Sequence, residues 1–167
     1  MIRKILLGLL AVLIIIQFFR PERNLSGDDT GHLANLYSFP GDVAPLIEKA
    51  CYDCHSNKTE YPWYANVQPA AWWLANHVKE GKEHLNFSAF TTYPREDHAH
   101  IFEEIVETVK EKEMPLKSYT FLGLHPEAKL TDAQRMAITT WAQEQMAVAE
   151  GRPGPGQQPE EPGERED

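Results

Sequence analysis

Residues 50–56 read Ala-Cys-Tyr-Asp-Cys-His-Ser and contain the spacing Cys51-x-x-Cys54-His55. Near a helix end, two thiols three positions apart project from one side, and the next residue can turn its imidazole toward the same ligand. This string is an attachment signal for c-type haem, in which each thiol adds across a vinyl group and the histidine reaches the iron. The sequence therefore predicts one covalent haem c, with Cys51 and Cys54 as thioether residues and His55 as the proximal axial ligand.

Two other interpretations of the cysteine pair stay open. A thioredoxin-like redox site uses the same Cys-x-x-Cys spacing, but it needs a βαβ pattern, and no segment alternates convincingly between apolar and polar residues. The pair could also be half of a zinc site, with His77 and His84 as further ligands at an unusual spacing. A disulfide framework is excluded, because the chain has only two cysteines.

The sixth position of the iron decides whether the haem site is closed or open. Met114 is the candidate for the distal axial ligand, because it lies in a loop just after a predicted helix and is followed by Pro115. A Met/His pair is the usual ligation of cytochromes c and raises the reduction potential. A second histidine would lower the potential, and five histidines remain as alternatives: His77, His84, His98, His100 and His125.

Apolar periodicity in the middle of the chain predicts an all-α fold. We expect four helices there, over about 43–51, 68–79, 96–112 and from residue 131 onward. Gly81 is expected to end the second helix, and Thr131 with Gln134 forms a capping box at the start of the fourth. Trp72 and Trp73, on the second helix, are candidates for an aromatic wall beside the haem.

The chain divides by composition into four segments. Residues 1–19 start with the basic pair Arg3 and Lys4 and stay apolar except for Gln17, which predicts an uncleaved signal anchor or transmembrane helix. This anchor is expected to place the domain on the periplasmic side of the inner membrane. The other segments are a linker, the c-type haem-binding domain and a disordered tail rich in Pro, Gly and Glu: residues 20–38, 39–150 and 151–167.

The chain resembles a bacterial haem-binding domain family that is common in Bacteroidetes. The likeness covers most of the chain, in QFFRPERN (17–24), the stretch from CYDCH to NFSAF (51–90) and the stretch from EMPLK to TTWA (113–142). The family is defined by the Cys-x-x-Cys-His motif, and the resemblance implies haem binding and a fold similar to class I cytochrome c with extra loop sequence. Met114-Pro115 and the helix after Thr131 match the usual cytochrome c order. Some related domains are joined to di-haem cytochrome c peroxidase modules, which hints at electron transfer.

These patterns favour a membrane-tethered periplasmic cytochrome that transfers electrons, and so an electron carrier rather than a catalyst. The alternatives are a small haem peroxidase and a haem-based gas or redox sensor, both of which need an open or displaceable sixth site. An interaction protein with an ordinary thiol pair is a further alternative. The net charge of −9 excludes the basic surface that nucleic-acid binding needs. A redox partner protein is expected, and the sequence does not identify it.

Overall fold

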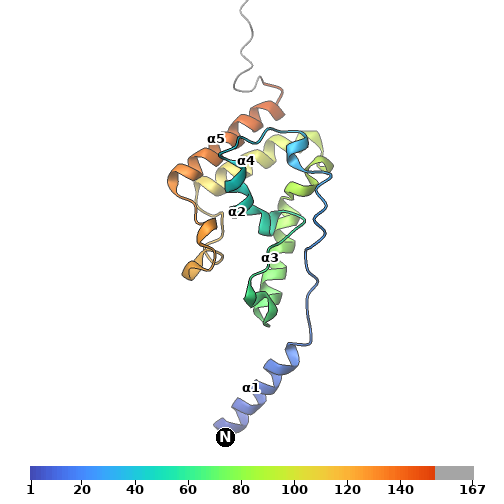
Figure 1. Ribbon diagram of the computed structural model, residues 1–167, viewed down its shortest axis with the longest axis vertical. Coiled ribbons are helices and arrows are strands. Elements are labelled where there is room, and N and C mark those ends of the chain that lie inside the picture. Colours follow the sequence, from blue (N-terminus) through green and yellow to red (C-terminus); the bar gives the residue numbers. More distant parts are fainter. Residues whose placement is uncertain (153–167) are drawn as a thin grey trace, which may run out of the picture. The chain divides into compact units, whose positions relative to one another are not determined.

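The structure is a computed structural model that describes residues 1–152, and every regular element in this part of the chain is helical (Figure 1). This confirms the predicted all-α class. In that range, short 3-10 turns connect five α-helices: α1 (Ile2–Ile16), α2 (Ala44–His55), α3 (Ala70–His84), α4 (His98–Lys110) and α5 (Asp132–Ala149). The predicted disordered tail lies outside the described residues from position 153 onward.

The chain forms two compact units, and the division between them falls inside α2, after Ala50. Unit 1 comprises residues 1–33 and 51–90, and therefore contains α1, α3 and the Cys51–His55 motif. Unit 2 comprises residues 34–50 and the chain from 91 onward, and therefore contains α4, α5 and Met114. The two predicted axial ligands thus belong to different units.

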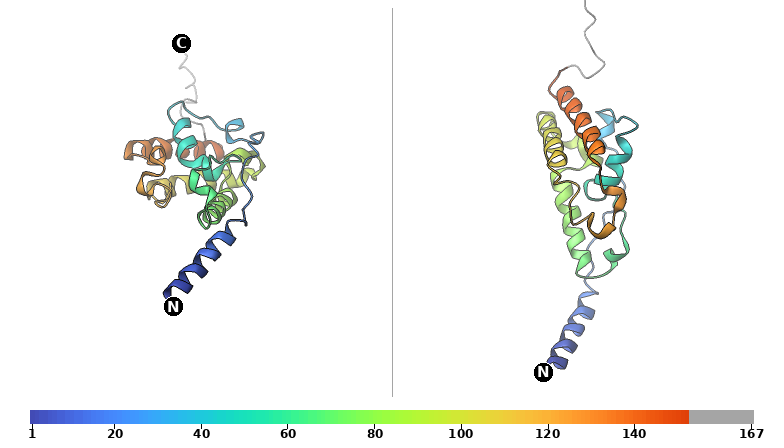
Figure 2. Two further views of the ribbon diagram at one scale, coloured as in Figure 1. Left: turned by 60° about the horizontal axis from the view of Figure 1, so that its bottom comes forward. Right: turned by 90° about the vertical axis from the view of Figure 1, so that its left-hand side faces the viewer.

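Unit 2 is built on the packing of α4 against α5, which run side by side in Figure 2. Its core is aromatic: the Phe102 ring makes edge-on contacts with Tyr37 and Trp141, at centroid distances of 4.8 and 5.8 Å. The Trp141 indole N–H donates a 2.7 Å hydrogen bond to the carbonyl of Ser38. The apolar periodicity that predicts the third helix also predicts its buried face: Ile101, Phe102, Ile105 and Val109 are buried, and Val106 is half-buried.

Unit 1 is built on α3, which packs against the 3-10 turn η2 (Trp63–Asn66). Leu74 and Val78 on α3 are buried together with Ala65 of η2. Three partly buried side chains pack against this cluster: Cys54, Tyr61 and Tyr64. The small core of unit 1 therefore lies directly beside the cysteine motif.

Two helices run further than the sequence indicated. α2 continues through the whole motif to His55. The expectation that Gly81 ends the second helix is wrong, because α3 passes through Gly81 and stops only where Leu85 becomes extended. Glycine in a helix costs only about 1 kcal/mol relative to alanine, so a packing demand can override its preference for helix ends. The capping box of Thr131 and Gln134 is confirmed at the start of α5.

The N-terminal apolar stretch forms α1, none of whose residues is buried. Within residues 1–152, no helix combines the length and the apolar character needed to cross a membrane. The polar stretch after α1 is held by hydrogen bonds: Asn24 binds the Tyr61 hydroxyl through its backbone N–H at 2.8 Å, and its side-chain amide donates to the Ser56 carbonyl at 2.8 Å. The start of the expected linker at 20–38 is therefore bound along unit 1, while the domain boundaries themselves stay a prediction.

Candidate functional site

The Cys51–Cys54–His55 motif occupies the last turn of α2, with all three residues half-buried. Both cysteines are free thiols. Residues three apart on a helix lie on the same side, about one turn from each other, so both sulfur atoms can serve one ligand. The helix end thus brings together the two thiols and the imidazole that the sequence singled out.

Burial makes both thiols weak acids. Removal from water raises the pKa of Cys51 to about 12, and the neighbouring Cys54 adds to the shift. Desolvation likewise raises the pKa of Cys54 to about 11, with a further contribution from the charge of Asp53. Redox-active Cys-x-x-Cys pairs have lowered thiol pKa values, because the thiolate is their reactive form. The environment of this pair is opposite to the one that a thioredoxin-like site needs.

His55 is oriented by a backbone carbonyl. Its Nδ1 lies 3.0 Å from the carbonyl oxygen of Leu85, the residue that follows α3. A carbonyl can only accept, so Nδ1 carries the proton and Nε2 keeps its lone pair. Burial lowers the pKa of His55, against the opposing effect of the backbone groups of Leu85 and Gly81. A neutral imidazole fixed through Nδ1 is the usual arrangement of a histidine that binds metal through Nε2.

Gly81 lets α3 approach the end of α2. A Cβ atom at this position would lie 2.8 Å from the carbonyl oxygen of Cys54 and 3.1 Å from its Cβ. The first of these atoms belongs to the backbone, which cannot turn aside as a flexible side chain does. This contact was missed at the sequence level, although a glycine inside a helical pattern is a known sign of close packing.

Buried polar residues fix the chain just after the motif. The backbone N–H of Asn57 donates to the Ser88 hydroxyl at 3.0 Å, and the Asn86 amide donates to the Asn57 side chain at 2.9 Å. Ser56, Asn86 and Ser88 are all buried. These residues hold residues 56–57 against the segment that supplies Leu85. The sequence alone does not indicate these residues, because lone Asn and Ser residues form no recognisable pattern.

Trp72 and Trp73 do not lie on the buried face of α3. Their side chains are 40% and 43% exposed, whereas Ala71, Leu74 and Val78 on the same helix are buried. The Trp72 indole N–H donates to the carbonyl of Phe19 at 2.9 Å. Their assignment to a haem wall stays a prediction. The residues that pack against Cys54 are the aliphatic ones.

Met114 lies in unit 2, in the loop after α4, where it is half-buried. Both backbone polar groups of Met114 form hydrogen bonds. Its N–H donates to the carbonyl of Thr108 at 3.0 Å, and its carbonyl accepts from the Arg135 guanidinium at 2.6 Å. Arg135 also donates to the carbonyl of Val109 at 2.8 Å. The loop is therefore well anchored within unit 2, and the role of Met114 as distal ligand stays a prediction.

The alternative histidine ligands differ in availability. His98 is 1% exposed, and its two ring nitrogens lie 2.8 Å from the Tyr37 hydroxyl and 3.2 Å from the Tyr93 carbonyl. Both nitrogens are thus in use within unit 2. His77 Nδ1 lies 2.9 Å from the Trp73 carbonyl, and His125 Nδ1 lies 3.3 Å from Glu127. Both ring nitrogens of His100 face carboxylates, those of Glu103 and Glu104. Within residues 1–152, no three Cys, His, Asp or Glu side chains gather closely enough to hold a metal ion.

Comparison with known proteins gives one match. The sequence model of a family described as "Haem-binding domain" matches residues 11–144, which include the cysteine motif, Gly81, Met114 and most of α5. No curated protein and no solved structure matches the chain.

Proposed function

The chain belongs to the haem-binding domain family, and on that premise we propose that it carries one haem c, joined to Cys51 and Cys54 and ligated by His55. In each attachment a thiol S–H adds across a vinyl C=C bond, so the sulfur binds one carbon and the hydrogen the other. This addition needs no oxidant. The observation that carries the proposal is the motif turn itself: two free thiols beside an imidazole whose Nδ1 is held by Leu85.

The raised thiol pKa values support attachment over a free redox pair. Protonated thiols at Cys51 and Cys54 exchange slowly with disulfides, which disfavours thioredoxin-like chemistry. The apolar surroundings of Cys54, formed by Leu74, Val78 and Ala65, suit a porphyrin edge. The residues of unit 1 therefore fit a haem in both donor set and environment.

We propose that the protein transfers electrons, with Met114 as the sixth ligand in a fold similar to class I cytochrome c. Bound haem supplies a one-electron iron couple, whose potential a thioether ligand raises. Leu85 keeps the imidazole of His55 in its ligating tautomer. Arg135 holds the backbone of the Met114 loop. The assignment of Met114 rests on chain order, with the cysteine motif first and the methionine loop before the last helix.

We further propose that residues 1–19 tether the protein to the inner membrane, with the haem domain in the periplasm. α1 supplies fifteen apolar and basic residues of this stretch, which make about 22 Å of helix. A typical hydrocarbon core is about 30 Å thick, so Gln17, Phe18 and Phe19 would extend the helix toward the interface. Arg3 and Lys4 at its start favour a cytoplasmic N-terminus.

The direct test of haem attachment is a pyridine haemochrome assay on protein expressed with a c-type maturation system. We expect covalent haem that stays with the wild-type polypeptide during acid–organic extraction. The double variant Cys51→Ala/Cys54→Ala should release all of its haem. The control His84→Gln changes an exposed histidine at the end of α3 and should keep the haem bound. Extraction of haem from the wild type would contradict the proposal.

A further inference from the structure

The end of α1 is joined to the folded part of unit 1 by a cluster of hydrogen bonds. Gln17 and Gln68 bind each other: the Gln68 backbone N–H donates to the Gln17 side chain at 2.9 Å, and the Gln17 amide donates to the Gln68 carbonyl at 3.3 Å. The carbonyl of Phe19 accepts from the Gln68 amide at 2.8 Å and from the Trp72 indole at 2.9 Å. The end of α1 is therefore fixed directly to the start of α3 by these hydrogen bonds.

Large apolar side chains are exposed around this junction. Phe18 is 82% exposed and Trp63 is 74% exposed. We call the whole group the interfacial patch, defined as Phe18, Phe19, Trp63, Val67 and Trp72. Tryptophan concentrates at the level of lipid headgroups, because its ring combines an apolar body with a polar N–H group, and the patch contains Trp63 and Trp72. The patch is thus continuous with an apolar helix that has no buried residue.

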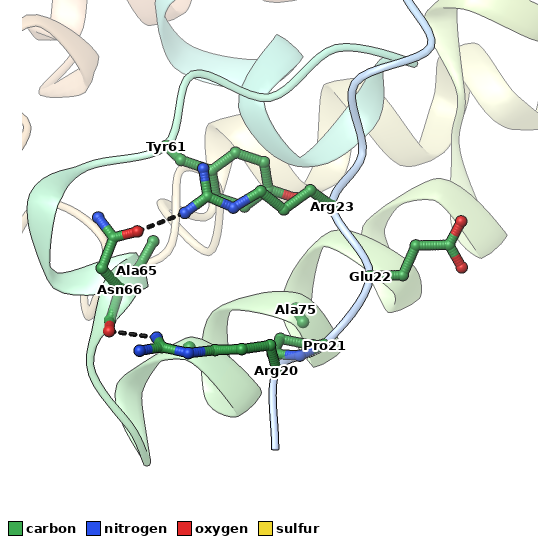
Figure 3. Close-up of a pocket in the computed structure, with 9 residues that line it drawn as sticks. Arg20, Pro21, Glu22, Arg23, Tyr61, Ala65, Asn66 and Ala75 are labelled. Atoms are coloured by element: carbon green, nitrogen blue, oxygen red, sulfur yellow. Dashed lines mark hydrogen bonds between the residues drawn. The ribbon is translucent and has the colours of Figure 1, made fainter. Parts of the chain in front are cut away.

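A pocket of about 230 Å³ opens beside the patch, between residues 20–23, η2 and α3 (Figure 3). Arg20 donates to the Asn66 carbonyl and Arg23 to the Asn66 side chain, so both guanidinium groups lie along one wall. Arg23 also stacks over the Tyr61 ring, with 4.9 Å between its guanidinium carbon and the ring centroid. Glu22 is the acidic residue among the lining side chains, which leaves the pocket with one net positive charge.

We propose that the interfacial patch rests on a phospholipid bilayer and that the pocket binds the phosphate of an anionic headgroup between Arg20 and Arg23. This inference rests on the proposed tether. A guanidinium carries five N–H donors, so the bond to Asn66 leaves several donors on each arginine for phosphate oxygens. Arginine near an anionic leaflet is also attracted by the surface potential. A bilayer is favoured over a soluble partner, because the apolar helix α1 leads directly into the patch.

This arrangement orients unit 1. The junction fixes the start of α3 at the bilayer surface, and Gly81 fixes the other half of α3 against Cys54. The cysteine motif is therefore held at a set place along α3, nine residues or about 14 Å of helix beyond Trp72. A redox partner within the same membrane would meet the haem in one orientation.

The test uses the full-length haem-loaded protein in vesicles of phosphatidylcholine, with or without roughly one third phosphatidylglycerol. Each vesicle also contains a phospholipid with a diazirine at the glycerol level, and adducts are mapped by mass spectrometry after irradiation. We expect adducts in residues 18–23 and 63–72. The peptide that contains His84, at the far end of α3, should stay unlabelled.

Labelling of residues 18–23 should be greater in vesicles with phosphatidylglycerol than in vesicles without it. Each of the two arginines should contribute a factor of about five to this increase. The variant Arg20→Gln/Arg23→Gln should lose this preference while it keeps its partition into vesicles. The control Glu22→Gln removes a charge from the same pocket and should keep the preference or increase it.

Each contrary outcome has a distinct meaning. Labelling confined to α1 would overturn the inference and leave the tether intact. Equal labelling with and without phosphatidylglycerol would show that the pocket takes no anionic headgroup. Failure of the whole protein to float with vesicles would overturn both the inference and the tether, while a retained Soret band would leave the haem proposal standing.

Discussion

Gly81 is the residue that lets α3 lie against the end of α2. With only hydrogen on its Cα, it admits the Cys54 carbonyl at a distance that any side chain would block. The same approach brings the end of α3 to the motif, and Leu85 then binds the Nδ1 of His55. One glycine thus supports both the packing of the cysteine turn and the orientation of the His55 imidazole.

Gly81→Ala is expected to destabilise the haem-loaded protein by about 1–2 kcal/mol, although alanine is the better helix former. The added methyl group must displace the backbone of Cys54 or bend α3. Denaturant unfolding monitored through the Soret band measures the change. Gly41→Ala is the control, because nothing lies within 4 Å of its Cβ position, and its effect should stay within about 0.5 kcal/mol. If Gly81→Ala changed the unfolding free energy as little as Gly41→Ala, the close contact between Gly81 and the Cys54 carbonyl would be contradicted.

Met114→Ala tests the sixth ligand. The wild type is expected to be six-coordinate and low-spin, with the weak methionine–iron charge-transfer band in its oxidised spectrum. The variant should lose this band, become high-spin and bind cyanide quickly, because the thioether is gone. Met136→Ala is the control, since Met136 is an exposed residue of α5. A Met114→Ala spectrum identical to that of the wild type would assign the sixth position to another group. A high-spin wild type would favour the peroxidase or sensor alternatives.

At the level of elements, α5 organises the loop that carries Met114. Its first turn is fixed by the capping box, in which the Thr131 hydroxyl accepts from the Gln134 N–H and the Gln134 side chain accepts from the Thr131 N–H. Arg135 follows directly and donates to the carbonyls of Val109 and Met114. These carbonyls belong to the end of α4 and to the loop, so one side chain joins three segments of unit 2.

Arg135→Gln should therefore loosen the Met114 loop. Two hydrogen bonds from a charged donor are lost, which we expect to cost about 2 kcal/mol of unfolding free energy. Backbone amides between residues 110 and 116 should exchange faster with deuterium, and the charge-transfer band should weaken. Arg152→Gln, at an exposed position after α5, is the control and should change neither property. Unchanged exchange in Arg135→Gln would show that the loop is held by other contacts.

Local patterns made much of this structure predictable. The apolar stripe of α4 and the capping box of α5 depend on residues three or four apart, so the sequence alone indicates them. Gly81 depends on a contact with Cys54, 27 positions earlier, and its intrinsic preference pointed to a helix end instead. The roles of Asn24 and Asn86 were equally unpredictable, because their partners are distant in the chain and their residue type is common in loops.

At the level of the whole molecule, the residues of the candidate site also fall into those that a local pattern predicts and those that it does not. Cys51, Cys54 and His55 lie in one helical turn, so their spacing alone predicts their association. Met114 belongs to the other unit and is related to the motif only by chain order. The proposed covalent and proximal half of the haem site is thus predictable from a local pattern in the sequence. The proposed roles of Met114 and of the membrane contact depend on residues that are distant in the chain, so no local pattern predicts them.

All of the proposed roles depend on the covalent attachment of one haem to Cys51 and Cys54. The mass of the intact, exported protein under denaturing conditions tests this claim most directly, because a non-covalent haem dissociates before detection. We expect a mass equal to the polypeptide plus one haem for the wild type, and the mass of the polypeptide alone for Cys51→Ala/Cys54→Ala. A wild-type mass equal to the bare polypeptide would contradict it.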